Sequence, residues 1–67
     1  MRRFAERFRE LRCDKNLSMK DLSKEINISD ATISRWENGI NDIKGDQLII
    51  VAKFFGVSAD YLLGLED

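Results

Sequence analysis

The sequence predicts a compact all-α domain of five short helices, on three observations. Apolar residues recur at intervals of three and four, which is the helical period, and no stretch keeps the apolar–polar alternation of a strand. The 67 residues contain no proline, so no helix is broken from within. Serine stands before the periodic segments, and asparagine or glycine stands after them, where helices start and stop. We expect one domain covering residues 1–67.

The first helix is predicted by Phe4, Phe8 and Leu11, which fall on one stripe at helical spacing. It is expected to end between residues 14 and 16.

The second helix has the clearest start signal in the chain. In "LSMKDL", Ser18 can cap the helix and Asp21 completes a capping box, while Leu17 and Leu22 stand in hydrophobic-staple positions. The helix should end by Asn27, a residue type that tolerates the left-handed conformation. Its inward side chains are expected to be Met19, Leu22 and Ile26.

The third helix follows after a very tight turn at Asn27 and Ile28. In "SDATISRWENG", Ser29 is the predicted cap and Gly39 the stop. A turn this short allows two helices to cross steeply, as in helix-turn-helix motifs.

The last two helices are predicted from "QLIIVAKFFG" and "VSADYLLG". The first is apolar nearly all round, which predicts burial on several sides, and Gly56 should end it. Ser58 should cap the short final helix, which runs to Leu63.

Composition excludes several classes of function. The single Cys13 cannot form an internal disulfide, and without any histidine there is neither a Cys/His metal cluster nor a histidine general base. The serines have no histidine partner, and no glycine-rich phosphate loop is present. We expect no enzymatic activity, no cofactor or metal and no small-molecule substrate.

Hydropathy and charge indicate a cytoplasmic protein with an ordinary surface. No apolar run reaches the roughly 18 to 20 residues of a membrane span, and charged residues interrupt the N-terminal segment too early for a secretory signal. The net charge of −1 and the pI of about 5.4 argue against a strongly basic nucleic-acid binder. Residues 1–38 nevertheless carry nine Lys and Arg against seven Asp and Glu.

The run "LRCDKNLSMKDLSKEINISDATISRWENG", continued by "LIIVAKFFGVSADYLLG", resembles the lambda-repressor-like, or XRE-type, helix-turn-helix family of phage and bacterial transcriptional regulators. The likeness covers about residues 4–64, and the motif itself covers about residues 18–38. It implies a five-helix domain that binds double-stranded DNA, usually as a homodimer, with the recognition helix at residues 29–38 in the major groove. The implied function is sequence-specific transcriptional regulation, of the repressor type.

The resemblance assigns base reading to the outward side of the third helix. Arg35 can donate two hydrogen bonds to guanine, although it could instead be a surface arginine paired with Asp30 or Ser34. Asp30 can accept from cytosine N4 or simply suit the positive end of the helix dipole. Ala31 can touch a thymine methyl, and Ser34 specifies little because it bonds many partners.

Four further residues are candidates for the DNA backbone: Lys20, Thr32, Asn38 and Lys44. Here the chain departs from the family pattern, because many members have glutamine at the position of Met19 and a basic, proline-containing loop after the glycine. In "INDIKGD" Lys44 is the sole cation. This departure weakens the expectation of strong phosphate contacts.

Two structural roles complete the prediction. The positions of Arg12 and Glu37 match a pair that joins the first and third helices in the family and would set the angle of the recognition helix. The expected core residues are Phe4, Phe8, Leu22, Ile26, Ile33 and Trp36.

The apolar C-terminal end is the expected dimer surface, formed by Tyr61, Leu62, Leu63 and Leu65. Core packing explains Leu62 equally well. The alternative function is a protein-interaction module with the same fold, such as the antitoxin of a toxin–antitoxin pair, which the acidic pI and Asp30 favour. Retention on heparin or mixed-sequence DNA at low salt distinguishes the two.

Overall fold

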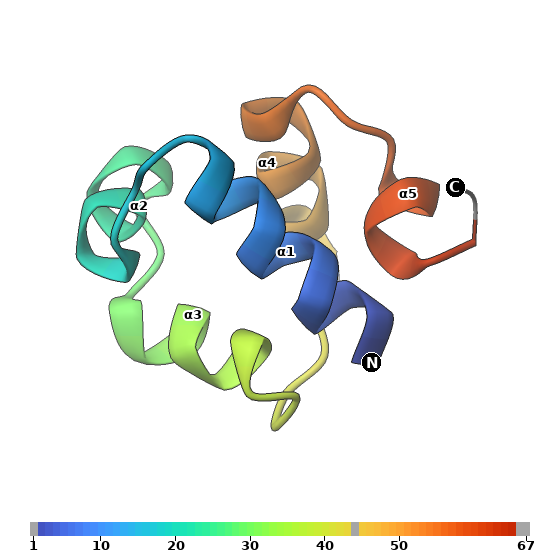
Figure 1. Ribbon diagram of the computed structural model, residues 1–67, viewed down its shortest axis with the longest axis horizontal. Coiled ribbons are helices and arrows are strands. Elements are labelled where there is room, and N and C mark those ends of the chain that lie inside the picture. Colours follow the sequence, from blue (N-terminus) through green and yellow to red (C-terminus); the bar gives the residue numbers. More distant parts are fainter. Residues whose placement is uncertain (1, 44, 66–67) are drawn as a thin grey trace.

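The computed structural model describes residues 2–43 and 45–65, which form five helices and no strand. The helices are α1 (Arg2–Asp14), α2 (Met19–Ile26), α3 (Asp30–Glu37), α4 (Asp46–Phe55) and α5 (Ala59–Leu63) (Figure 1). The all-α, five-helix prediction is confirmed. The predicted backbone contact Lys44 lies outside the described residues.

The helices surround one core. In Figure 1, α1 lies in front of α4, with α2 and α5 at opposite ends of the molecule and α3 below. α1 packs against α3 and α5, while α2 packs against α3 and α4. The recognition helix predicted from the sequence is therefore held from two directions, by α1 and by α2.

The helix boundaries follow the local signals in the sequence. Ser18 Oγ accepts a hydrogen bond from the Asp21 amide at 3.0 Å, and Asp21 Oδ2 accepts from the Ser18 amide at 3.4 Å, which completes the predicted capping box. Asn27 ends α2 in the left-handed conformation, with φ of 58°. Ser29 and Ser58 cap α3 and α5. The tight turn between α2 and α3 thus lies where it was predicted.

An aromatic cluster occupies the centre of the core. The rings of Phe4 and Phe8 both meet Trp36 edge to face, with centroids 6.0 and 5.6 Å apart. Such edge-to-face pairs favour one geometry over others and so help to fix α3 against α1. All six predicted core residues are buried. Ile43, which follows α3 in a loop, is also buried and was not anticipated.

α4 departs from the expectation of burial on several sides. Val51 is fully buried, but Ile49 and Ile50 are 53% and 41% exposed. α2 and α5 pack against α4, and the Phe8 ring of α1 meets the Phe55 ring edge to face, but no described element covers the side that carries Ile49 and Ile50. The helix ends at Gly56, as predicted, with φ of 68°.

At the C-terminal end, the structure bears out the core alternative for Leu62. Leu62 is fully buried and belongs to the core, so it cannot form part of a dimer surface. The Arg7 guanidinium lies 4.3 Å from the centroid of the Tyr61 ring and donates to the Tyr61 carbonyl oxygen. Leu63 packs against the core. Of the four predicted dimer residues, only Leu65 is an exposed large hydrophobic residue.

Candidate nucleic-acid interface

α3 has two chemically different faces. Its inner face is buried in the core and consists of Ile33, Trp36 and Glu37. Its outer face brings together the four residues predicted to read bases. Asp30, Ala31 and Arg35 are exposed, and Ser34 is half-buried. Because positions 30, 31, 34 and 35 lie about one turn apart in pairs, the four side chains share one side of the helix.

Arg35 is free to contact a ligand. Its side chain is exposed and lies in the last turn of α3. Within the described residues, no hydrogen bond or ion pair joins its guanidinium to another group. The alternative pairing with Asp30 or Ser34 is therefore absent, and the five donors of the guanidinium face solvent.

The inner face of α3 is tied to α1 by a buried carboxylate. Glu37, whose side chain is fully buried, accepts from Arg12 Nε at 2.6 Å and from Arg12 Nη2 at 2.9 Å. Arg12 Nη1 also donates to the carbonyl oxygen of Leu17 at 2.8 Å. The contact predicted between Arg12 and Glu37 is present, and it joins α3, α1 and the loop before α2.

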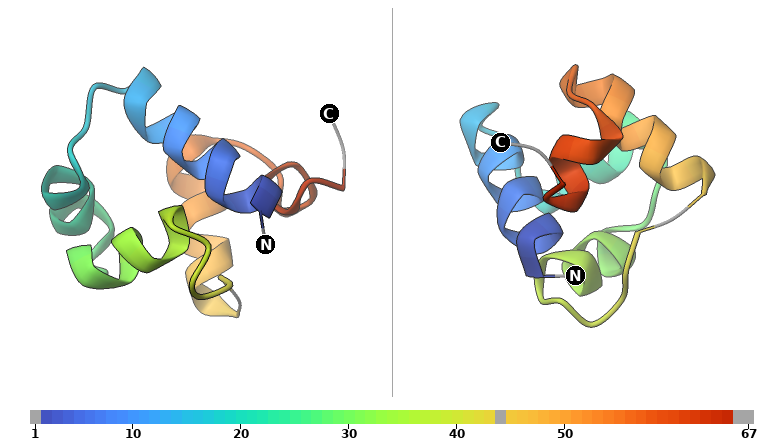
Figure 2. Two further views of the ribbon diagram at one scale, coloured as in Figure 1. Left: turned by 60° about the horizontal axis from the view of Figure 1, so that its bottom comes forward. Right: turned by 90° about the vertical axis from the view of Figure 1, so that its right-hand side faces the viewer.

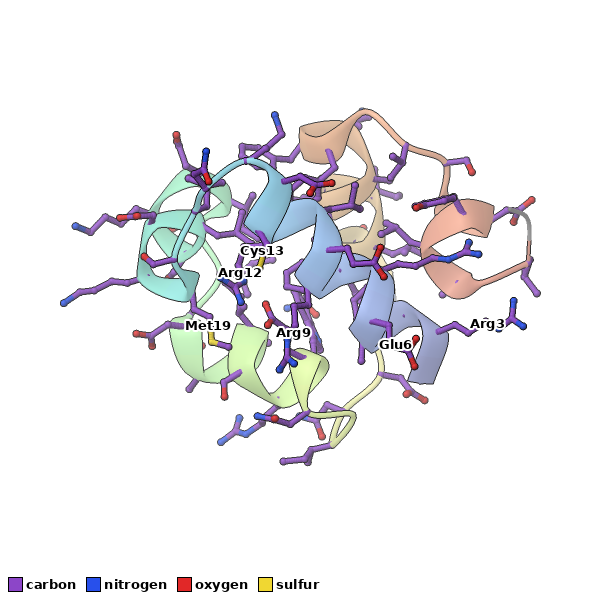
Figure 3. The ribbon with its side chains drawn as sticks, viewed as in Figure 1. Arg3, Glu6, Arg9, Arg12, Cys13 and Met19 are labelled. Carbon is purple, nitrogen blue, oxygen red and sulfur yellow. The ribbon has the colours of Figure 1, made fainter. Side chains whose placement is uncertain are left out.

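A second arginine completes this network. Arg9 Nε lies 3.2 Å from Glu37 Oε1, and Figure 3 shows Arg9 and Arg12 reaching from α1 toward α3. The sequence prediction missed Arg9, although its spacing of three residues from Arg12 places both on one face of a helix. Hydrogen bonding to Glu37 raises the pKa of Arg12; burial opposes this shift and the negative charge of Glu37 adds to it. The two arginines neutralise the buried carboxylate.

The predicted backbone contacts differ in their freedom. Lys20 is exposed at the start of α2 and has no side-chain partner in the described residues. Thr32 Oγ1 is 2.8 Å from Ser29 Oγ, so its hydroxyl is already engaged. Asn38 Nδ2 donates to Ser34, at 2.9 Å to the carbonyl oxygen and 3.3 Å to the hydroxyl. Lys20 can therefore bind a phosphate directly, whereas a phosphate would have to replace the existing hydrogen bonds of Thr32 and Asn38.

The family model of the helix-turn-helix family matches residues 8–62 of this chain. The match covers α2 and α3 and most of the remaining fold, so the chain belongs to the helix-turn-helix family, of the XRE type. Membership in this family of transcriptional regulators agrees with the expectation that the chain is not an enzyme.

Three relatives share the domain. The HTH-type transcriptional activator BcrR of Enterococcus faecalis is 36% identical over 64 residues, covering 96% of this chain and 31% of that protein. The uncharacterized HTH-type transcriptional regulator YobD of Bacillus subtilis strain 168 is 34% identical over 64 residues, covering 96% of this chain and 57% of that protein. The HTH-type transcriptional regulator ImmR of the same strain is 29% identical over 62 residues, covering 92% and 49%.

The chain thus spans between 31% and 57% of the length of these relatives. No solved structure gives a significant match to it. Among the described residues, no helix is both long enough and apolar enough to cross a membrane.

Proposed function

We propose that this domain binds double-stranded DNA sequence-specifically in the cytoplasm, as the DNA-binding part of a transcriptional regulator. The carrying observation is the division of α3 into a locked inner face and a free outer face. Glu37 and Trp36 fix the helix on the domain, while Arg35 and its neighbours remain exposed. The major groove of DNA admits one α-helix, and hydrogen-bonding side chains on its outer face can reach the base edges.

Each outer residue has a chemical counterpart in the groove. Arg35 donates two hydrogen bonds to O6 and N7 of a guanine, which discriminates against other bases by about 1–3 kcal/mol. Ala31 lies against a thymine methyl, and Ser34 adds a hydrogen bond of low selectivity. Asp30 accepts from a cytosine N4 and, through its charge, disfavours positions close to phosphate.

Backbone contacts set the register of the domain on DNA. Lys20 at the start of α2 and Lys44 after α3 supply positive charge, and Thr32 and Asn38 supply hydrogen bonds. Contacts of this kind add affinity without sequence information. Since the chain has a net charge of −1 and only two lysines are proposed to contact phosphate, we expect modest affinity for non-cognate DNA with a shallow salt dependence.

Two copies are proposed to bind one operator. A homodimer would present its recognition helices to adjacent major grooves about 34–36 Å apart, which requires half-sites one helical turn apart. Repression of the phage or bacterial type is the proposed outcome, although BcrR of Enterococcus faecalis is named an activator. Two reporters measure whether the protein represses or activates transcription, one with the selected site overlapping the promoter and one with the site upstream of it. Reduced expression from the reporter with the overlapping site supports repression. Increased expression from either reporter contradicts it.

The test is selection of bound duplexes from a random library. We expect an enriched motif that contains a guanine in each half-site, and binding to a scrambled duplex that is weaker at every salt concentration. An Asp60→Asn variant serves as a control, because Asp60 is exposed on α5, the helix that packs against α1 and α4; it should select the same motif. No enrichment, together with no retention on mixed-sequence DNA or heparin at low salt, would instead identify a protein-interaction module of the antitoxin kind.

A further inference from the structure

The outer face of α4 is a regular stripe of four exposed residues, here called the α4 stripe: Asp46, Ile49, Ile50 and Lys53. Their spacing of three, four and seven residues places them along one side of the helix. In the right-hand view of Figure 2, the first turn of α4 lies at the edge of the molecule, on the side away from α1. The stripe is thus accessible to a partner of similar length.

The order of the residues in the stripe is self-complementary. An acid stands at its N-terminal end, a base at its C-terminal end, and two isoleucines lie between them. A two-fold axis through the point midway between Ile49 and Ile50 would pair Asp46 with Lys53 of a second copy. The same axis would pair Ile49 with Ile50 of that copy. A two-fold contact repeats each pair, so both charges of each copy are matched.

We propose that the α4 stripe binds a second copy of this chain, with the two α4 helices antiparallel. The two isoleucine pairs form the apolar centre of this contact and exclude water. The two Asp46–Lys53 pairs at its ends fix the direction and register, because a parallel arrangement would set like charges together.

The charges of the stripe are not matched within one molecule. Among the described residues, neither Asp46 nor Lys53 has a side-chain hydrogen bond or ion pair. Along one helix they are separated by seven residues, about 10.5 Å of axial rise, which is far beyond ion-pair distance. The two other exposed large hydrophobic residues, Ile40 and Leu65, lie outside the described helices. The complementary pattern therefore belongs to α4.

The size of the stripe indicates a weak contact in free solution. α4 has ten residues, and one face of so short a helix buries much less than the roughly 800 Å² per partner of a standard interface. Association becomes effective when two copies are already held side by side, because their local concentration is then high. The α4 contact is the interface of the dimer in the proposed function. Only its role on DNA rests on that proposed function. Association itself is measured without DNA.

Charge reversal gives a test that separates pairing from folding. In the Asp46→Lys variant both end charges are positive, and in the Lys53→Asp variant both are negative. Each variant alone should self-associate about tenfold more weakly than the unsubstituted chain, because both end pairs become repulsive. In an equimolar mixture, every end pair of the heterodimer is again attractive. We therefore expect the mixture to recover the association lost by both variants.

The readout is sedimentation equilibrium at concentrations up to about 1 mM, where contacts of this size become populated. Melting curves of each variant confirm that it is folded. Because mixing cannot change the fold of either monomer, recovered association can come only from contacts between the two copies. An Ile49→Ser and Ile50→Ser double variant should abolish association, while Ile40→Ser, a matched isoleucine off the stripe, should leave it unchanged.

Three results would overturn the proposal: an unsubstituted chain that stays monomeric at the highest concentration, a mixture that associates no better than its components, or a dimer abolished by Leu65→Ser. Loss of the dimer in the Leu65→Ser variant would place the dimer interface at the C-terminal end, as predicted from the sequence. None of these results touches the DNA-binding proposal, which fails only if library selection and retention on DNA fail.

Discussion

α3 and α4 are the two helices whose outer faces differ most in chemistry. Both bury apolar side chains on one side, Ile33 and Trp36 in α3 and Val51 in α4. The outer face of α3 carries hydrogen-bonding groups, with Arg35 unpartnered within the described residues, whereas the outer face of α4 centres on two isoleucines. A DNA groove offers donors and acceptors, and a second helix offers apolar surface. The chemistry of the outer face, rather than the packing beneath it, therefore distinguishes the partners.

The two helices also differ in how they are held. α3 has a side-chain cap at Ser29 and a buried carboxylate fixed by two arginines. α4 begins at Gly45 with no side-chain cap and is held by apolar contacts. A helix that reads bases requires a fixed orientation, because displacements of a fraction of an ångström break directional hydrogen bonds. A helix that presents a small apolar stripe requires a less precise orientation, because apolar contacts are not directional.

The largest effect is expected from removing the anchor of α3. Glu37→Ala leaves Arg12 without its carboxylate in a nearly dry site and should lower the free energy of unfolding by about 3–5 kcal/mol. Urea denaturation measures this change. The matched control is Arg9→Ala, which removes a side chain that is 55% exposed and should cost less than about 1 kcal/mol.

Equal losses of stability for the two variants would mean that the network acts as one unit and that the burial of a side chain does not determine its contribution.

The sign of the pKa shift gives a second check on the Arg12–Glu37 pair. The pKa of Arg12 is raised in the folded state, so its contribution to stability is complete below its unfolded-state pKa and is lost only as the pH rises through the folded-state value. The Arg12 contribution should therefore stay constant through the neutral and mildly alkaline range.

A matched isoleucine pair tests the two-faced description of the helices directly. Ile33→Ala on the inner face of α3 should destabilise the fold by about 2–5 kcal/mol, because it leaves a cavity in the core. Ile49→Ala on the α4 stripe should change stability by less than about 0.5 kcal/mol, since the side chain is half in water and alanine favours the helix. Thermal or urea unfolding of both variants gives the comparison. A large loss for Ile49→Ala would show that the outer face of α4 is covered in solution.

Local features of the fold were predictable from the sequence, because their causes lie within a few residues. Ser18 with Asp21, Asn27 and Gly56 act on their own backbone neighbours, and each marks a helix end as expected. Periodicity likewise identified the core side of α1, α2 and α3. The pairing of Arg12 with Glu37 came only from the resemblance, since 25 residues separate them.

Features that depend on tertiary contacts were missed or misjudged. The sequence prediction treated α4 as apolar nearly all round and so missed its exposed face. Asp46 and Lys53 lie on the same side as the exposed isoleucines, and their spacing was the signal that could have identified that face. Ile43 sits in a loop without periodicity, yet the fold buries it. Leu62 stayed open between a dimer surface and the core, because the helical pattern of α5 does not show which of its apolar side chains meets the core.

The effect expected next in size concerns the outer face of α3. Arg35→Ala should weaken binding to the selected duplex by about 1–3 kcal/mol and relax the preference at one base pair in each half-site. Lys20→Ala and Lys44→Ala should instead weaken all duplexes alike and reduce the salt dependence by about one charge each. Salt titrations on selected and scrambled duplexes separate the two patterns. If Arg35→Ala weakens both duplexes equally, Arg35 is a phosphate contact and the outer face does not read a base through it.

The smallest effect tests how far the start of α3 depends on its cap. Ser29 Oγ accepts from the Thr32 amide at 3.2 Å, so Ser29→Ala leaves that amide to water and should cost about 1 kcal/mol of stability. Ser29→Gly should cost only a few tenths of a kcal/mol, because glycine suits the extended cap conformation and lets water reach the amide. The two variants also free the Thr32 hydroxyl, which is now engaged by Ser29. Urea unfolding gives the stability of each variant, and DNA titration gives its affinity. If both variants lose stability equally, the hydroxyl of Ser29 is not what caps α3. If both instead gain affinity for every duplex, Thr32 is a backbone contact that the cap restrains in the free protein.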